Sequence, residues 1–301
     1  GLSVGAPGQT SNGRDTRPAG PAKTGRPMDI DDPDALTDVH VARRQIGQAD
    51  TVAAQRRWWD LEARDYHADH GAFLADVGFV WGPEGWTEAE LDLLGARRGD
   101  RILEIGGGAG QCARWLRAER GVEVVTTDLS GGMLEVGREI DRRHGIALAM
   151  AQCDGSVLPF ADSSFDTVFT AYGVVPFVAD SARVMSEACR VLRPGGRFVF
   201  ATTHPVRWAF PDVPGVEGLT VSGSYFDRTP YVEGLTDGSA TYAEHHRTLG
   251  DRVREIVAAG LVLDDLVEPE WPERNQQVWG GWSPRRGALL PGTAIFVCHR
   301  P

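Results

Sequence analysis

The sequence predicts an α/β fold, a three-layer sandwich in which helices cover both faces of a mostly parallel sheet. Short runs rich in Val, Ile and Leu alternate with segments whose apolar residues recur at helical spacing. Residues 101–105 form one such strand and run directly into a glycine turn. Residues 122–128 form a second strand that ends in a carboxylate about 20 residues beyond the turn, the separation of one strand–helix–strand unit. This alternation is typical of a parallel sheet.

The glycine turn is the most informative local feature. Gly106, Gly108 and Gly110 lie where the first strand turns into a helix predicted over residues 111–120. Glycine tolerates positive φ and lets a ligand approach the backbone, and the helix presents its free N–H groups to that ligand. A dinucleotide fingerprint would need a third glycine at position 111, where this chain has Gln111. An NAD-dependent oxidoreductase is therefore a weaker alternative.

The remaining elements follow in the order that a parallel sheet needs. After the second strand, the spacing predicts a helix at 129–140 and a third strand at 147–153. A fourth strand is predicted at 167–171, followed by a helix at 182–191 and a fifth strand at 197–202. The last predicted elements are a helix at 246–259 and strands at 261–268 and 293–300. Between the fifth strand and that helix lies an insertion, residues 205–245.

The turn from Glu104 to Gly110 reads E-x-G-x-G-x-G and resembles the first motif of the class I S-adenosylmethionine (SAM)-dependent methyltransferases. The segments LPFADSSFD and LRPGG are similar to later motifs of that family, in the same order, so that the resemblance covers roughly residues 104–203. It implies a Rossmann-like, seven-stranded sheet with an antiparallel last strand and SAM as cofactor. The small-molecule, type 11-like branch is the most similar; it includes quinone-biosynthesis and natural-product tailoring enzymes.

The resemblance also implies which residues contact the cofactor. Asp128 is expected to bind the ribose hydroxyls and Asp154 to lie at the adenine edge. Tyr66 and Trp81 are placed by resemblance near the methionine half, although packing against the sheet is the alternative for either ring. The complete expected set is Tyr66, Trp81, Glu104, Gly106, Gly108, Gly110, Asp128, Leu129, Met133, Asp154, Gly155 and Ala171.

The chain outside the motifs divides into a tail, a lid and a cap. Residues 1–45 lack periodicity and are predicted to be a disordered tail, with order beginning near Asp50 and Met28 as a candidate natural start. A helical lid, with helices at 52–67 and 82–95, opens a methyltransferase domain of residues 46–204 and 246–301. Residues 205–245 form a substrate-side cap, with a hairpin at 222–233.

Aromatic residues in the cap and in a later loop suggest a pocket for a flat acceptor. The expected acceptor contacts are Trp208, Tyr225, Tyr231 and Trp271. The alternative is that the aromatics of the cap form a small core of its own, which such a segment needs.

The predicted reaction is an in-line displacement that moves a methyl group to a small aromatic or heteroaromatic acceptor, indole-like rings included. Alignment of the reactants supplies ~7–11 kcal/mol in such reactions. His204 follows the fifth strand and is the candidate base, if the acceptor loses a proton; the alternative is a histidine that fixes the turn before Pro205. A non-catalytic SAM- or nucleotide-binding module is the alternative from another class.

The composition limits the classes of partner that we expect this protein to bind. The net charge of −11 argues against nucleic acid, and the sequence has no apolar run long enough to span a bilayer. The four cysteines are scattered, with no metal-binding spacing. We therefore expect a soluble, cytoplasmic monomer or homodimer that binds a small-molecule acceptor, no nucleic acid, no membrane and no metal.

The composition of the first residues generates a test. Residues 1–27 are rich in Gly, Pro, Thr and Arg and cannot bury a core. Their deletion should leave both the melting temperature and the activity unchanged. A clear loss of either would show that this segment contributes to the folded protein.

Overall fold

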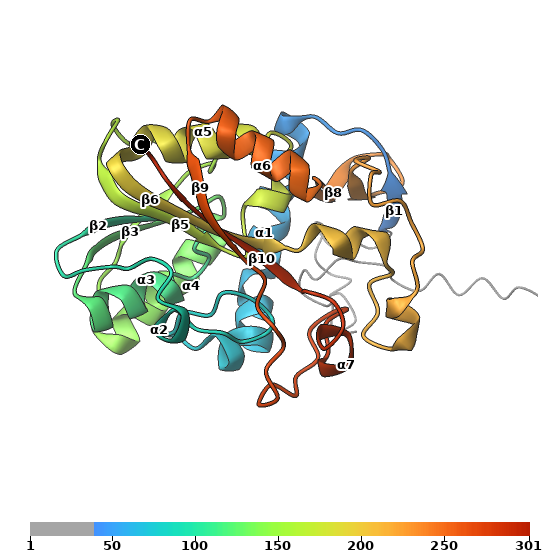
Figure 1. Ribbon diagram of the computed structural model, residues 1–301, viewed down its shortest axis with the longest axis horizontal. Helices are drawn as coiled ribbons and strands as arrows, with labels where there is room; N and C mark the ends of the chain where they lie inside the picture. Colours follow the sequence, from blue (N-terminus) through green and yellow to red (C-terminus); the bar gives the residue numbers. More distant parts are fainter. Residues whose placement is uncertain (1–38) are drawn as a thin grey trace, which may run out of the picture.

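A seven-stranded sheet forms the centre of the molecule (Figure 1), in a computed structural model that describes residues 39–301. The strand order is β4-β3-β2-β5-β6-β10-β9. β10 runs antiparallel to both of its neighbours, and the other pairs in this sheet are parallel. The predicted fold class is therefore confirmed. The strands are β2 (Arg101–Ile105), β3 (Glu123–Asp128), β4 (Ala149–Gln152), β5 (Phe165–Ala171), β6 (Leu192–Thr203), β9 (Val262–Val267) and β10 (Thr293–His299).

Helices cover both faces of this sheet because its central strands carry apolar residues on both sides. Phe198 and Phe200 of β6 pack with α5 and α6 on one face. The alternate residues, Val199 and Ala201, pack on the other face in a cluster that includes residues of α3. This alternation follows the two-residue period of a strand. The helices are α1 (Gln48–Leu74), α2 (Glu88–Leu91), α3 (Gln111–Trp115), α4 (Gly131–His144), α5 (Ser181–Val191), α6 (Leu249–Ala258) and α7 (Pro284–Gly287).

A second sheet corrects the expectations for the tail and the cap. β1 (His40–Arg43) pairs antiparallel with β7 (Tyr231–Gly234), which pairs with β8 (Ala240–Glu244). Order therefore begins before Asp50, and the part of the predicted tail before Val39 lies outside the described residues. The hairpin is β7–β8, and residues 222–233 do not form it. An Asp-Gly turn is the reason: Asp237 accepts hydrogen bonds from Ser239, and Gly238 has a φ of 85°.

The lid helices differ from their predicted lengths. α1 is longer than expected at both ends, whereas the helix predicted over residues 82–95 is reduced to α2. The buried carboxylate of Glu88 explains the early end, because it accepts the backbone N–H groups of Leu93 and Leu94. These bonds turn the chain out of the helix, and Asp92 adopts a left-handed conformation at its end.

The cap packs against α1. Trp58 of α1 forms a cluster with Tyr231 and Tyr242, which lie on β7 and β8. The rings of Trp58 and Tyr242 are 5.3 Å apart between centroids. The aromatics of the cap thus form a small core with α1, which fixes the position of that helix relative to the large sheet.

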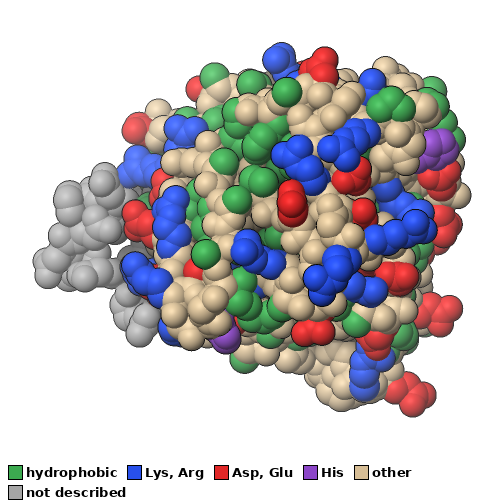
Figure 2. All heavy atoms as spheres, turned by 90° about the vertical axis from the view of Figure 1, so that its left-hand side faces the viewer, with side chains coloured by type: hydrophobic (Ala, Val, Ile, Leu, Met, Phe, Trp, Pro, Cys, Tyr) green, Lys and Arg blue, Asp and Glu red, His purple; other side chains and the backbone are tan. Residues whose placement is uncertain are grey.

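Charged side chains of both signs are interspersed over the face shown in Figure 2, with apolar side chains between them. Among residues 39–301, no helix is both long enough and apolar enough to cross a membrane.

Candidate functional site

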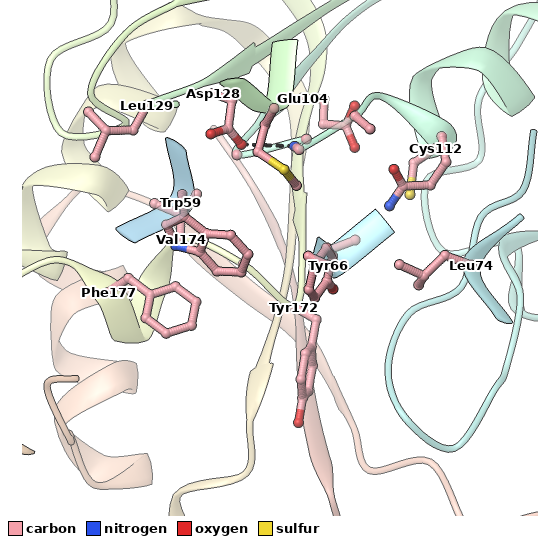
Figure 3. Close-up of a pocket in the computed structure, with 18 of the residues that line it drawn as sticks. Trp59, Tyr66, Leu74, Glu104, Cys112, Asp128, Leu129, Tyr172, Val174 and Phe177 are labelled. Atoms are coloured by element: carbon pink, nitrogen blue, oxygen red, sulfur yellow. Dashed lines mark hydrogen bonds between the residues drawn. The ribbon is translucent and has the colours of Figure 1, made fainter. Parts of the chain in front are cut away.

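A cavity lies at the carboxyl ends of the central parallel strands, where open α/β sheets bind their ligands (Figure 3). The loops after β2, β3, β4 and β5 supply one side of its lining, and α1 supplies the other. In Figure 3, Glu104 and Asp128 lie at one end of the cavity, and Phe177 and Tyr172 lie toward the other. The cavity therefore has a carboxylate end and an aromatic end.

The glycine turn brings the backbone to the cavity wall. Gly106, Gly108 and Gly110 have φ values of 66°, 56° and 82°, a region that favours glycine. A Cβ atom at Gly106 would lie 2.2 Å from Cγ2 of Val174, and one at Gly107 would lie 2.4 Å from Oε2 of Glu104. Side chains at these two positions would fill the space beside the turn. The sequence of the turn is therefore required both by its conformation and by its close contacts.

Two carboxylates, the buried Glu104 and the half-buried Asp128, line the carboxylate end. Glu104 is 2% exposed and accepts a hydrogen bond from Thr126 at 2.7 Å, and burial raises its pKa to about 7. Asp128 accepts the N–H of Gly108 at 2.8 Å and the N–H of Ser130 at 2.9 Å. Burial raises the pKa of Asp128 above its usual value despite these bonds. Because the charged form of each acid is penalised by desolvation, this end of the cavity favours a cationic ligand.

One face of α1 forms the opposite wall. Val52, Gln55, Trp59 and Tyr66 are spaced by three, four and seven residues, so they share one side of the helix. Trp59 and Tyr66 meet edge to face with ring centroids 5.4 Å apart. The helix is tied to the start of α4, because Asp60 accepts a hydrogen bond from the Ser130 hydroxyl at 2.6 Å and from the Gly132 N–H at 3.0 Å.

The aromatic end combines residues from three segments. Phe177 lies in the short 3-10 helix η2 (Val175–Phe177) after β5, 6.1 Å from Trp59 between ring centroids. Tyr172 has a φ of 62°, a strained conformation for a bulky residue. Trp279 comes from the loop before β10 and stacks on His70 of α1, with centroids 4.6 Å apart and ring planes 9° apart. The lining at this end is therefore built from segments far apart in the sequence.

Most of the expected cofactor residues come together in the cavity. The expected residues that line it are Tyr66, Glu104, Gly106, Gly108, Asp128, Leu129, Met133, Asp154, Gly155 and Ala171. Gly110 belongs to the same turn and is the N-cap of α3. The structure corrects the expectation that Trp81 contacts the cofactor. Trp81 is fully buried outside the lining, donates its indole N–H to Glu88 at 3.0 Å and packs against Phe79.

The structure also corrects the expectation that His204 is the base. It is 4% exposed and lies outside the cavity lining among the described residues. Its Nδ1 accepts the N–H of Val206 at 3.1 Å, and its Nε2 is 2.7 Å from Oε1 of Glu268. Both ring nitrogens are thus engaged in holding the turn after β6, and the geometry does not support a role as base.

The four residues expected to contact an acceptor also lie outside the lining. Tyr231 packs with α1, and Trp208 faces the guanidinium of Arg43. The Tyr225 hydroxyl accepts the N–H of Leu249 at 2.8 Å, and Trp271 donates to the backbone of Asn275 at 2.8 Å. Three of these side chains hold the cap against β1, α1 and α6, and Trp271 holds the loop of residues 269–291 together.

Sequence reasoning missed several lining residues at the aromatic end. Gln55 and Trp59 lie eleven and seven residues before Tyr66, which was expected at the site, so helical spacing could have placed them on the same face. Phe177 and Tyr172 lie in the segment directly after β5. Trp279 carries no sequence signal, because only the fold brings its loop to α1. Among residues 39–301, no group of three or more His, Cys, Asp or Glu residues is arranged to hold a metal ion.

Comparisons with known proteins agree with this architecture. Residues 103–200 match a family model described as a methyltransferase domain. The chain is 43% identical over 127 residues to a demethylmenaquinone methyltransferase from Beutenbergia cavernae, covering 41% of this chain and 49% of the relative. It is 35% identical over 157 residues to a demethylmenaquinone methyltransferase from Thermus thermophilus, covering 51% of this chain and 67% of that relative.

The chain thus spans about half the length of the first of these relatives. Among solved structures, it resembles a SAM-dependent methyltransferase from Mesorhizobium loti with a TM-score of 0.53 and 23% identity. That likeness covers 73% of this chain and all of the other. It shows a shared fold.

The raised pKa of Glu104 generates a prediction about stability. The folded protein retains the Glu104 proton up to about pH 7, whereas an unfolded chain releases it near 4.5. This residue therefore stabilises the ligand-free protein below pH 4.5, and the contribution is lost as the pH rises through 7. The stability of the wild type relative to Glu104→Gln should fall by up to about 3 kcal/mol across that window. Urea denaturation at a series of pH values measures it.

A matched control is Glu119→Gln, which changes an exposed glutamate. Its stability relative to the wild type should be nearly independent of pH. A flat profile for Glu104→Gln as well would contradict the inference that burial penalises the Glu104 charge.

Proposed function

Since the chain belongs to the class I SAM-dependent methyltransferases, with SAM as cofactor, we propose that it transfers the cofactor's methyl group to a small aromatic or heteroaromatic acceptor. One observation carries the proposal. A single cavity combines a glycine turn, two carboxylates whose pKa values are raised, and an aromatic wall. The first two suit a cationic nucleoside, and the third suits a flat ring beside it.

The residues of the carboxylate end fit the cofactor. Asp128 would accept hydrogen bonds from the ribose hydroxyls, and Glu104 would face the ammonium group of the methionine half. Gly106 and Gly108 would let the ligand lie against the backbone, with Gly110 at the start of α3. The other residues that we assign to the cofactor are Tyr66, Leu129, Met133, Asp154, Gly155 and Ala171.

The protein's contribution to the reaction is alignment and exclusion of water. When bound, SAM supplies a methyl group on a positively charged sulfur, which leaves as a neutral thioether when a nucleophile attacks the carbon in line. Trp59 and Phe177 form apolar walls that would hold an acceptor ring and keep water away from it. Ala171 and Tyr172, directly at the end of β5, would separate the two ligands.

The proposed acceptor class rests on the aromatic end of the cavity. Rings such as Trp59, Phe177 and Trp279 favour contact with another flat, weakly polar ring. The names of the two relatives, both demethylmenaquinone methyltransferases, support an aromatic or quinone-type acceptor. The class that we propose includes quinol rings and indole-like rings.

Calorimetry followed by turnover tests the proposal. The protein should bind SAM and should bind NADH at least about a hundredfold more weakly, because Gln111 replaces the third glycine of a dinucleotide turn. Formation of S-adenosylhomocysteine should then depend on an added aromatic acceptor. Tight NADH binding would contradict the cofactor assignment. SAM binding without turnover on a panel of quinols, phenols and indoles would identify a non-catalytic binding module instead.

Asp128 provides a sharper test of the cofactor end. Asp128→Ala should weaken SAM binding by roughly 1–3 kcal/mol, because charge-assisted hydrogen bonds to the ribose are lost. Asp128→Asn keeps one acceptor oxygen, so its affinity for SAM should fall less. Calorimetric titration of both variants gives the comparison, and an unchanged affinity in Asp128→Ala would show that the ribose binds elsewhere.

A further inference from the structure

Gln55 is the neutral amide on an otherwise apolar stretch of the α1 wall. Gln55 is 2% exposed and lines the cavity together with Val52, Trp59, Phe177 and Val178. Its Nε2 donates a hydrogen bond to the backbone carbonyl of Ala243 on β8. No atom of residues 39–301 forms a hydrogen bond with its Oε1, although that oxygen is buried.

The bond to Ala243 fixes which end of the amide is free. If the amide were turned over, Oε1 would face the carbonyl oxygen of Ala243, and two acceptors would meet. Nε2 therefore points to β8, and Oε1 is the end of the amide that has no partner among residues 39–301. The cap thus orients a side chain of the site without lining it.

A buried acceptor without a donor is costly. Leaving such an oxygen unpaired costs about 1–3 kcal/mol, which a ligand with an N–H or O–H group recovers on binding. The cationic and hydroxyl groups of the cofactor have Glu104 and Asp128 as partners in the proposed function. Gln55, by contrast, lies among the aromatic side chains at the acceptor end.

We infer that Oε1 of Gln55 accepts a hydrogen bond from the methyl acceptor, and that the acceptor is an aromatic ring that carries a hydroxyl or N–H group. This inference rests on the proposed function and narrows it. Phenols, aryl amines, quinols and indoles have the required donor. Rings without a donor leave Oε1 unpaired and bind more weakly.

Equilibrium binding to the full chain tests the inference without turnover. The protein is saturated with S-adenosylhomocysteine and titrated with 2-naphthol and with naphthalene, which share a flat two-ring system but differ in the donor. The readout is the ratio of the two dissociation constants. The wild type should bind 2-naphthol at least about fivefold more tightly, and Gln55→Met, which has a similar length and no amide, should lose that preference.

Gln48→Met is the matched control on the same helix. Gln48 anchors α1 through hydrogen bonds with Ser156, Ala179 and Asp180, and it does not line the cavity among the described residues. Its replacement loosens the helix without removing Oε1 of Gln55, so the preference for 2-naphthol should persist. Gln55→Asn withdraws the amide by one methylene and should lose the preference even if the methionine variant folds poorly.

Two outcomes would overturn the inference. A ratio that is unchanged in Gln55→Met and Gln55→Asn would show that Oε1 does not recognise the acceptor. A loss of S-adenosylhomocysteine affinity in the Gln55 variants but not in Gln48→Met would assign the oxygen to the cofactor. Failure of the wild type to bind S-adenosylhomocysteine would instead overturn the proposed function itself, so the two failures are distinguishable.

Discussion

The hydrogen bonds of Asp128 hold the site together. One carboxylate oxygen accepts the N–H of Gly108 in the turn after β2, and the other accepts the N–H of Ser130 before α4. The acid therefore joins the ends of two neighbouring strands and fixes the glycine turn against β3. Partial burial raises the pKa of Asp128, so the bonds that organise the turn also hold this carboxylate where its charge is costly. Hydrogen bonds from the hydroxyl groups of a ligand would relieve part of that cost.

The opposite wall depends on contacts made far from the sheet. Asp60 ties α1 to the start of α4, and Trp58 packs α1 against the cap. β1 extends the cap sheet by one strand, so the segment before α1 stabilises the surface on which α1 rests. The cap contributes to the site by holding the helix in place, and Gln55 shows how a contact on β8 can orient a group in the cavity.

The sequence predicted what local chemistry determines. Short motifs, whose conformation is set by neighbouring residues, predict the succession of the central strands along the chain and the glycine turn. They also predict the positions of Glu104 and Asp128 beside that turn. The incorrect expectations share a different cause. Trp81 is expected near the cofactor by resemblance, His204 by its place directly after the fifth strand, and Tyr231 as an aromatic residue of the cap. Their positions are set instead by partners such as Glu88, Glu268 and Trp58. Only tertiary packing brings these partners together, so no local pattern distinguished a buried structural ring from one that lines a site.

This division between local and tertiary determinants also separates the two halves of the site. The family match covers residues 103–200, which contain the glycine turn, both carboxylates and the segment after β5. The α1 wall and the loop that carries Trp279 lie outside that match. In the proposed function, most of the cofactor contacts come from the matched region, whereas much of the surface facing an acceptor comes from segments outside that match. In the proposed function, the choice of acceptor therefore depends largely on residues outside the family match, such as Gln55 and Trp59.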